Sequence, residues 1–237
     1  MSLKRENNEE DWNNEEEDSF ENEITSIEDV EFVIKGDDDK IKLIEYPPRK
    51  ILFIASNPKD LDDLDQKNES KAIEYVFLKE PGFKFTPRFN ISRHELLKYL
   101  YGNEPHILHF SGHGEEGFVS LENSEGMPDS FQIKKFGDLI KAYNRNRKDR
   151  LVGVIISSCF SISEAEKISE NVDFVIAMSG DISVKAANDF ILGFYEMLIT
   201  KHSISDAYES ALSMIDEEEE EIPKLLPNKD FKRIYLF

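Results

Sequence analysis

The stretch LVGVIISSCFS, residues 151–161, decides the fold class of this chain. Its first six residues are apolar or glycine, which is typical of a strand buried on both faces of a parallel sheet. The apolar run ends just before Cys159, and Ser161 followed by Glu164 predicts a capping box that opens a helix. A buried strand that leads through a short polar turn into a helix indicates an α/β fold.

Comparable apolar runs recur on both sides of this stretch. We expect strands at residues 50–55, 84–89, 107–110, 151–156 and 174–178, with helical patterns between them. Pro87 cannot donate a hydrogen bond to a neighbouring strand, so the second run is expected at an edge of the sheet. The alternation predicts a mostly parallel sheet flanked by helices on both faces.

Helix starts are marked by further serine and acidic pairs. Ser92 with Glu95 predicts a capping box for a helix that runs to about Tyr101, and Ser203 with Asp206 resembles another helix start. A third helix is expected to place one apolar face in the core, with Ala187, Phe190, Ile191, Phe194 and Leu198 at helical spacing.

The N-terminal region differs from the rest in charge. Residues 1–30 carry 12 acidic and two basic side chains, a net charge of −10. This segment is either a solvated, disordered tail or a docking or inhibitory arm for a basic partner. Two strand patterns, at residues 31–35 and 40–45, flank the turn residues 36–39 and predict a β-hairpin. The expected organisation is an acidic arm at 1–30, a hairpin extension at 31–48 and one α/β domain at 49–237.

Composition excludes several classes of function. The chain has 49 acidic and 29 basic side chains, and its net charge of −20 repels phosphate backbones and anionic membranes. We expect no direct nucleic-acid binding and no membrane partner. No apolar run approaches the roughly 20 residues that span a bilayer, and the first residues lack a secretory signal, which predicts a cytoplasmic protein. The lone cysteine, Cys159, excludes an internal disulfide and a multi-thiolate metal site.

The first candidate site is HFSGHG, residues 109–114, which follows the apolar pair Ile107-Leu108 and precedes a short strand at 118–121. The glycines beside His113 let the chain turn sharply and leave the backbone N–H of Gly114 free to point outward. This pattern suits an exposed, functional imidazole. The alternative is a tight turn whose histidine is merely solvated.

The second candidate site is Cys159 itself, at the carboxyl end of a strand, where reactive groups gather in open α/β sheets. The start of the following helix is expected to lower the pKa of the thiol. The alternative is an inert buried cysteine. If the strands are parallel neighbours, Cys159 and His113 come together as nucleophile and base, and their separation of 46 residues is close to the roughly 50 seen in caspases.

Taken together, an apolar strand, HFSGHG, a second apolar strand and SSCFS resemble the catalytic core of CHAT domains, a caspase-like cysteine peptidase family related to caspases and separase. The resemblance covers residues 50–237 and includes the opening strand ILFIASNP at 51–58 and the later stretch VIAM at 175–178. The residues before Cys159 are serines, so the Q-A-C pattern of caspases is absent and aspartate specificity is not expected.

The resemblance implies a cysteine endopeptidase with Cys159 as nucleophile and His113 as general acid and base. The backbone N–H groups of Gly114 and Cys159 would form the oxyanion hole. No third catalytic residue is evident, so we expect a dyad. The resemblance further implies a protein substrate, a regulatory protein partner, and a role in a bacterial defence or cell-death pathway. No cofactor is expected.

The resemblance also places the first substrate pocket at the residue two before the cysteine and at the loop after the next strand. These positions are occupied by Ser157, Met178, Ser179 and Asp181. Asp181 either faces the pocket and favours a basic substrate residue, or caps the helix that begins near Ser183.

Three other functions compete with this prediction. His106, His109 and His113 are spaced closely enough to invite a zinc site, but the pleat of a strand points residues at odd separations to opposite faces, so we expect no metal. A catalytically silent caspase-like scaffold would bind a partner without cleaving it. A hydrolase or acyltransferase that acts on a small molecule would use the same dyad in a deep, enclosed pocket.

Overall fold

The computed structural model describes residues 26–27, 30–31, 47–145 and 147–227. The chain divides into two units, residues 1–46 and 47–237. In the first unit the described residues form two short antiparallel strands, β1 (Ser26–Ile27) and β2 (Val30–Glu31). The hairpin predicted over residues 31–48 and most of the acidic arm lie outside the described residues, and both remain predictions.

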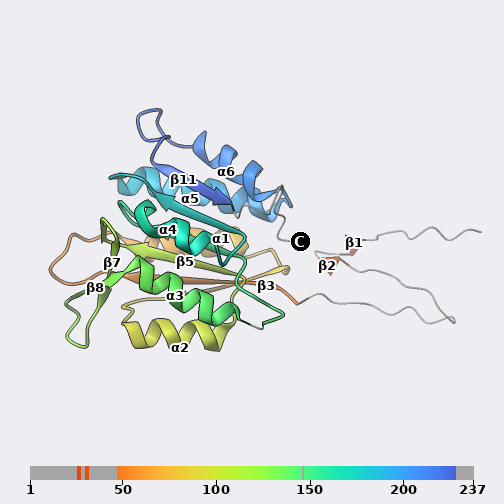
Figure 1. Ribbon diagram of the computed structural model, residues 1–237. Helices are drawn as coiled ribbons and strands as arrows, with labels where there is room; N and C mark the ends of the chain where they lie inside the picture. The colour runs from red at the N-terminus through yellow and green to blue at the C-terminus, as the bar shows by residue number, and fades with distance from the viewer. Residues whose placement is uncertain (1–25, 28–29, 32–46, 146, 228–237) are drawn as a thin grey trace, which may run out of the picture. The chain divides into compact units, whose positions relative to one another are not determined.

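In the second unit, strands and helices alternate as the sequence predicts (Figure 1). The elements are β3 (Arg49–Ser56), α1 (Gln66–Phe77), β4 (Phe83–Arg88), α2 (Arg93–Asn103), β5 (Ile107–Gly112), β6 (Gly114–Glu115), β7 (Phe118–Glu122), β8 (Pro128–Gln132), α3 (Ile133–Asn144), β9 (Gly153–Ser157), α4 (Ile162–Ser169), β10 (Phe174–Met178), α5 (Val184–Ile199), α6 (Ile204–Leu212) and β11 (Pro223–Pro227).

The main sheet of this unit has the strand order β11-β10-β9-β5-β3-β4. Every pair of neighbours is parallel except β10 and β11, which pair antiparallel. The strand β4, which contains Pro87, lies at one edge as predicted. The predicted fold class, a mostly parallel sheet of the caspase-like α/β type, is confirmed.

Helices cover both faces of the sheet (Figure 1). One apolar core joins alternate sheet residues such as Phe53 and Ile155 to helices α1, α5 and α6. The other core joins the intervening residues, such as Leu52 and Val154, to helices α2, α3 and α4. Because successive side chains of a strand point to opposite faces, a continuous apolar run such as ILFIA at 51–55 supplies both cores at once.

Of the capping boxes predicted at Ser92 and Ser161, the first forms and the second does not. Ser92 forms the predicted box, since its Oγ accepts from the Glu95 amide while the Glu95 carboxylate accepts from the Ser92 amide. Ser161 does not cap α4 through its side chain. Its hydroxyl is fully buried, donates to the carbonyl of Ile156 and accepts from the amide of Met178, so it joins β9 to β10.

The register of the central strands sets up the site. Ser56 of β3 lies opposite Gly112 of β5, and Ser111 of β5 lies opposite Ser157 of β9. The three strands therefore end at the same level, and the residues that follow β5 and β9 emerge side by side. A small antiparallel sheet of β6, β7 and β8 extends from this end and contains the strand predicted at 118–121.

Within the part of the chain that the structure describes, no helix is long and apolar enough to cross a membrane.

Candidate active site

The carboxyl ends of β5 and β9 open into a cleft of about 240 Å³. Both His113 and Cys159 line it, so the two residues singled out from separate motifs share one site. The remaining lining comes from the loop before α1, from α1 itself and from the segment that leads into α5. The parallel arrangement of β5 and β9 accounts for this convergence, because parallel neighbours end at the same edge.

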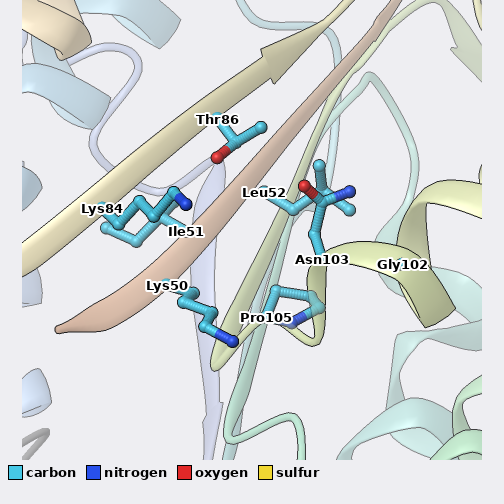
Figure 2. Close-up of a pocket in the computed structure, with 8 residues that line it drawn as sticks. All are labelled: Lys50, Ile51, Leu52, Lys84, Thr86, Gly102, Asn103 and Pro105. Carbon is cyan, nitrogen blue, oxygen red and sulfur yellow. The ribbon is translucent and has the colours of Figure 1, made fainter. Parts of the chain in front are cut away.

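A smaller cleft of about 130 Å³ lies at the opposite edge of the sheet, around the starts of β3 and β4 and the end of α2 (Figure 2). It contains Lys50, Lys84 and Thr86 but neither of the candidate catalytic residues. Both candidate catalytic residues therefore lie in the cleft at the carboxyl ends of the strands.

The imidazole of His113 is held by a backbone carbonyl. Its Nε2 lies 2.7 Å from the carbonyl oxygen of Asp62, in the loop before α1. A carbonyl oxygen only accepts hydrogen bonds, so Nε2 carries the proton and Nδ1 is the unprotonated nitrogen of the neutral ring. This tautomer leaves one nitrogen able to act as a base. The sequence does not reveal this contact, because any residue can supply a backbone carbonyl.

The thiol of Cys159 is half-buried and donates a hydrogen bond to the Oδ1 of Asp181, 3.2 Å away. The sequence left open whether Asp181 caps the following helix, and in the structure it does not. Ser183 caps α5 instead, because its Oγ accepts from the amide of Ala186. Asp181 therefore faces Cys159, the predicted nucleophile.

The surroundings of Cys159 raise the pKa of its thiol. Burial is the largest cause, and the hydrogen bond to Asp181 and the negative charge of that side chain add to it, while the backbone amide of Ile182 acts in the opposite direction. The prediction that the start of α4 lowers this pKa is therefore wrong for the structure observed. Burial and the neighbouring carboxylate both disfavour the thiolate, and together they outweigh the backbone amides that favour it.

Gly114 passes close to the backbone of the cysteine turn. A Cβ built on Gly114 would lie 2.0 Å from Ser158 Oγ and 2.8 Å from the carbonyl oxygen of Cys159. No larger residue fits without displacing that turn, so glycine is required by the close approach of two chain segments. This approach brings Gly114 beside Cys159, the other residue predicted to supply an oxyanion N–H.

Of the four predicted pocket residues, two line the cleft and two do not. Ser157 and Asp181 line the cleft. Met178 is fully buried in the core beneath α5, and Ser179 directs its hydroxyl to the carbonyls of Glu221 and Ile222.

Phe160 was not singled out from the sequence. It lines the cleft directly after the cysteine, with 44% of its surface exposed and a φ of 54°. A bulky aromatic residue seldom adopts this left-handed conformation, and such strain is concentrated at functional sites. The conformation leaves an aromatic ring exposed at the cleft.

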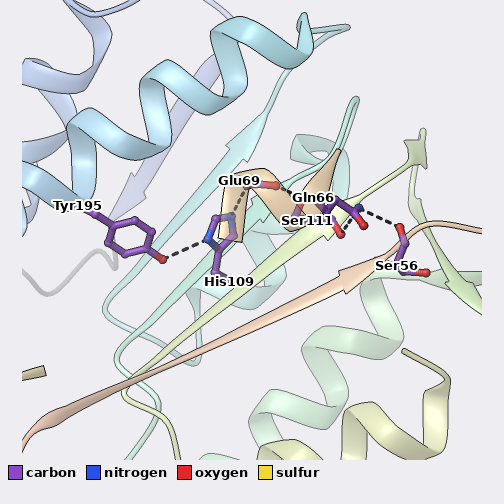
Figure 3. A network of polar contacts seen from close by, with 6 residues as sticks. All are labelled: Ser56, Gln66, Glu69, His109, Ser111 and Tyr195. Atoms are coloured by element: carbon purple, nitrogen blue, oxygen red, sulfur yellow. Dashed lines mark hydrogen bonds and ion pairs between the residues drawn. The ribbon is translucent and has the colours of Figure 1, made fainter. Parts of the chain in front are cut away.

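Figure 3 shows a buried polar network, of which Glu69 and Ser111 also line the cleft. Glu69 of α1 accepts a hydrogen bond of 2.6 Å from the hydroxyl of Ser111, two residues before His113. Gln66 donates from its Nε2 to the carbonyls of Ser56 and Ser111. Burial raises the pKa of Glu69 to about 7, and the bond from Ser111 opposes this rise.

The other two histidines of the motif region, His106 and His109, contact other parts of the fold. His106 Nδ1 accepts from the amide of Lys50 at the start of β3. His109 is fully buried with its Nδ1 3.2 Å from the hydroxyl of Tyr195, and burial lowers its pKa to about 3. His109 is therefore neutral at physiological pH.

Comparison with known proteins gives two relatives and no matching family model. A Roc-COR-CHAT protease from an unknown prokaryotic organism is 28% identical over 206 residues, which cover 77% of this chain and 19% of that protein. A probable protease of Gillisia limnaea (strain DSM 15749 / LMG 21470 / R-8282) is 26% identical over 155 residues, which cover 63% of this chain and 27% of that protein. The chain thus corresponds to a minor part of each curated relative. These relatives confirm the resemblance that the motifs indicated, and over most of its length the chain is similar to CHAT-domain proteases.

Proposed function

We propose that this protein is a cysteine endopeptidase in which Cys159 is the nucleophile and His113 the general acid and base. The observation that carries the proposal is the convergence of the two residues, from adjacent parallel strands, in one cleft. The tautomer set by Asp62 supports it, because an imidazole with a free Nδ1 is ready to accept a proton. The names of the two protease relatives support the same class of reaction.

The proposed reaction has two stages. His113 takes the thiol proton, and the Cys159 sulfur attacks the carbonyl carbon of the scissile peptide bond. His113 then returns the proton to the leaving amine as the C–N bond breaks, which leaves a thioester. His113 then takes a proton from a water molecule, which attacks the thioester carbon. The C–S bond breaks, the Cys159 sulfur takes the proton back from His113, and the new carboxyl group is released. The backbone N–H groups of Gly114 and Cys159 stabilise the oxyanion in both stages.

The cleft itself favours a peptide over a small molecule. Its volume of about 240 Å³ lies below the roughly 300 to 1,000 Å³ that encloses a drug-sized ligand. Phe160 and Val184 at its rim are 44% and 43% exposed, which gives an extended substrate apolar surface outside the pocket. A protein substrate that lies across the rim therefore suits this site.

The hydrogen bond from Cys159 to Asp181 favours one alternative, a silent scaffold in which the thiol is permanently held. We interpret the bond instead as the resting state of a regulated enzyme. Control by a protein partner and a role in bacterial defence or cell death belong to this proposal and follow from the resemblance. A cytoplasmic location also belongs to it and follows from the apolar pattern of the sequence.

The experiment that tests the proposal is cleavage of a peptide library derived from a bacterial proteome, read by mass spectrometry. We expect new peptide termini with the wild-type protein and none with Cys159→Ala or His113→Ala. His94→Ala is the matched control, since His94 is exposed on α2. Equal cleavage by wild type and Cys159→Ala would contradict the proposal. The absence of any cleavage, together with an unreactive thiol, would favour the scaffold.

A further inference from the structure

Glu69 lies where an apolar residue would be expected. It is 7% exposed, and on the same helix Ile73 and Phe77 are buried in the apolar core. Burial of a carboxyl group among apolar side chains costs free energy unless hydrogen bonds compensate. Only one of its oxygens is compensated, because Oε1 has no hydrogen-bond partner. Packing alone therefore does not explain this residue.

The compensated oxygen connects α1 to the strand that precedes His113. Oε2 of Glu69 accepts from the hydroxyl of Ser111, and Gln66, one turn earlier on the helix, donates to the carbonyls of Ser111 and Ser56. The first turns of α1 are thereby fixed to the ends of β5 and β3 (Figure 3). Of these two strand ends, that of β5 lines the cleft.

The loop immediately before α1 holds the imidazole itself. It carries Asp62, whose carbonyl accepts from Nε2 of His113. The same segment, residues 62–69, thus contacts Ser111 in β5 and His113 just after that strand. If α1 shifts relative to β5, the carbonyl of Asp62 shifts relative to the imidazole that it orients.

The Oε1 oxygen of Glu69, which has no hydrogen-bond partner among the described residues, faces a ring nitrogen that also has none. Oε1 of Glu69 lies 3.8 Å from Nε2 of His109, and that nitrogen also has no hydrogen-bond partner. Nδ1 of His109 is held by the hydroxyl of Tyr195. One proton between Oε1 and Nε2, on either atom, satisfies both groups after a small movement of α1 toward β5. In the structure the two atoms lie close together without a hydrogen bond, on the same strand that carries Ser111.

We propose that Glu69 is a positioning residue for the catalytic base, and that it acts through Ser111 and the start of α1 to hold the carbonyl of Asp62 against His113. The inference rests on the proposed function, because it takes His113 as the base. Glu69 does not touch the reacting atoms in this account. It fixes the distance between two backbone segments that orient the imidazole.

The test is the rate at which iodoacetamide alkylates Cys159 at pH 7, followed by mass spectrometry. We expect Glu69→Ala to slow alkylation by about tenfold and Ser111→Ala to slow it in parallel. Glu69→Gln should remain within about threefold of wild type, because its amide oxygen still accepts from Ser111. Glu74→Gln is the matched control, since Glu74 is an exposed glutamate of the same helix.

A double-mutant cycle separates positioning from a general loss of structure. If Glu69 acts through the base, Glu69→Ala has no further effect in a His113→Ala background. Equal slowing in both backgrounds, or wild-type rates for both Glu69→Ala and Ser111→Ala, would overturn the inference. Cooperative thermal unfolding verifies the fold of each variant, and Ser111→Ala carries the test if Glu69→Ala does not fold. Failure of His113→Ala alone to slow alkylation would instead contradict the proposed function.

Discussion

The sulfur of Cys159 lies 3.2 Å from Oδ1 of Asp181 and donates a hydrogen bond to it. The proposed nucleophile and an acidic side chain of the adjoining loop are therefore directly paired. Such a pair stabilises the thiol over the thiolate, because ionisation of the thiol would place two negative charges side by side. The site is well built for a nucleophile that stays protonated until a substrate or partner changes its surroundings.

Replacement of Asp181 by asparagine tests this pairing. Removal of the carboxylate charge is expected to lower the pKa of the Cys159 thiol and so to increase the thiolate fraction near neutral pH, because the hydrogen bond to Asp181 and the charge of its side chain both raise that pKa. The titration is followed by the ultraviolet absorbance of the thiolate, with Cys159→Ala as the blank. An unchanged titration curve would show that Asp181 does not hold the thiol in solution.

Phe160 is expected to contribute to peptide binding. Its ring is exposed beside the nucleophile in a left-handed backbone conformation. With a peptide identified from the library, Phe160→Ala should raise KM about threefold to tenfold with little change in kcat, because contact with a flanking substrate residue is uniform binding. Phe160→Tyr keeps the ring and serves as the control. A fall in kcat at constant KM would assign Phe160 a different role.

Ser161 is expected to matter for stability and not for chemistry. Its buried hydroxyl joins the carbonyl of Ile156 to the amide of Met178. Ser161→Ala should lower the free energy of unfolding by about 1 to 3 kcal/mol, because the amide of Met178 and the carbonyl of Ile156 each lose a buried hydrogen-bond partner. Urea denaturation measures the change. Ser163→Ala, an exposed serine of the same helix, should stay within about 0.5 kcal/mol of wild type.

The raised pKa of Glu69 predicts how the stability of the protein depends on pH. Its pKa is about 7 in the folded protein and 4.5 in the reference state, so the folded chain binds the extra proton between these values. Stability from this group is therefore full below pH 4.5 and is lost as the pH rises toward 7, by up to about 1.4 kcal/mol per pH unit. Glu69→Gln removes this loss, so its stability relative to wild type should increase from pH 4.5 to 7. Parallel stability curves for the two proteins would contradict the assignment.

Most of the α/β layout follows from sequence patterns. Continuous apolar runs such as 51–55 and 151–156 specify strands buried on both faces, and Pro87 correctly marks an edge. The patterns do not reveal α1, whose mixed polar surface includes the buried Gln66 and Glu69. They also miss β11, because its two prolines disfavour a strand except at an edge, where it is found.

The candidate site divides in the same way. His113 and Cys159 are recognisable because each follows an apolar strand, and parallel pairing then brings them into one cleft. The contacts of Asp62, Asp181 and Glu69 with these strand ends depend on tertiary geometry. Backbone carbonyls and loop carboxylates carry no periodic signal, so their partners become known only once the chain is folded.

The central claim is that Cys159 and His113 act as one catalytic unit, and the most direct measurement is the rate of Cys159 alkylation by iodoacetamide across pH in wild type and His113→Ala. The account predicts that loss of the imidazole slows alkylation about tenfold near pH 7 and moves the rate profile toward the higher pH of an unassisted thiol. Superimposable profiles for the two proteins would contradict it, because the histidine would then have no influence on the nucleophile.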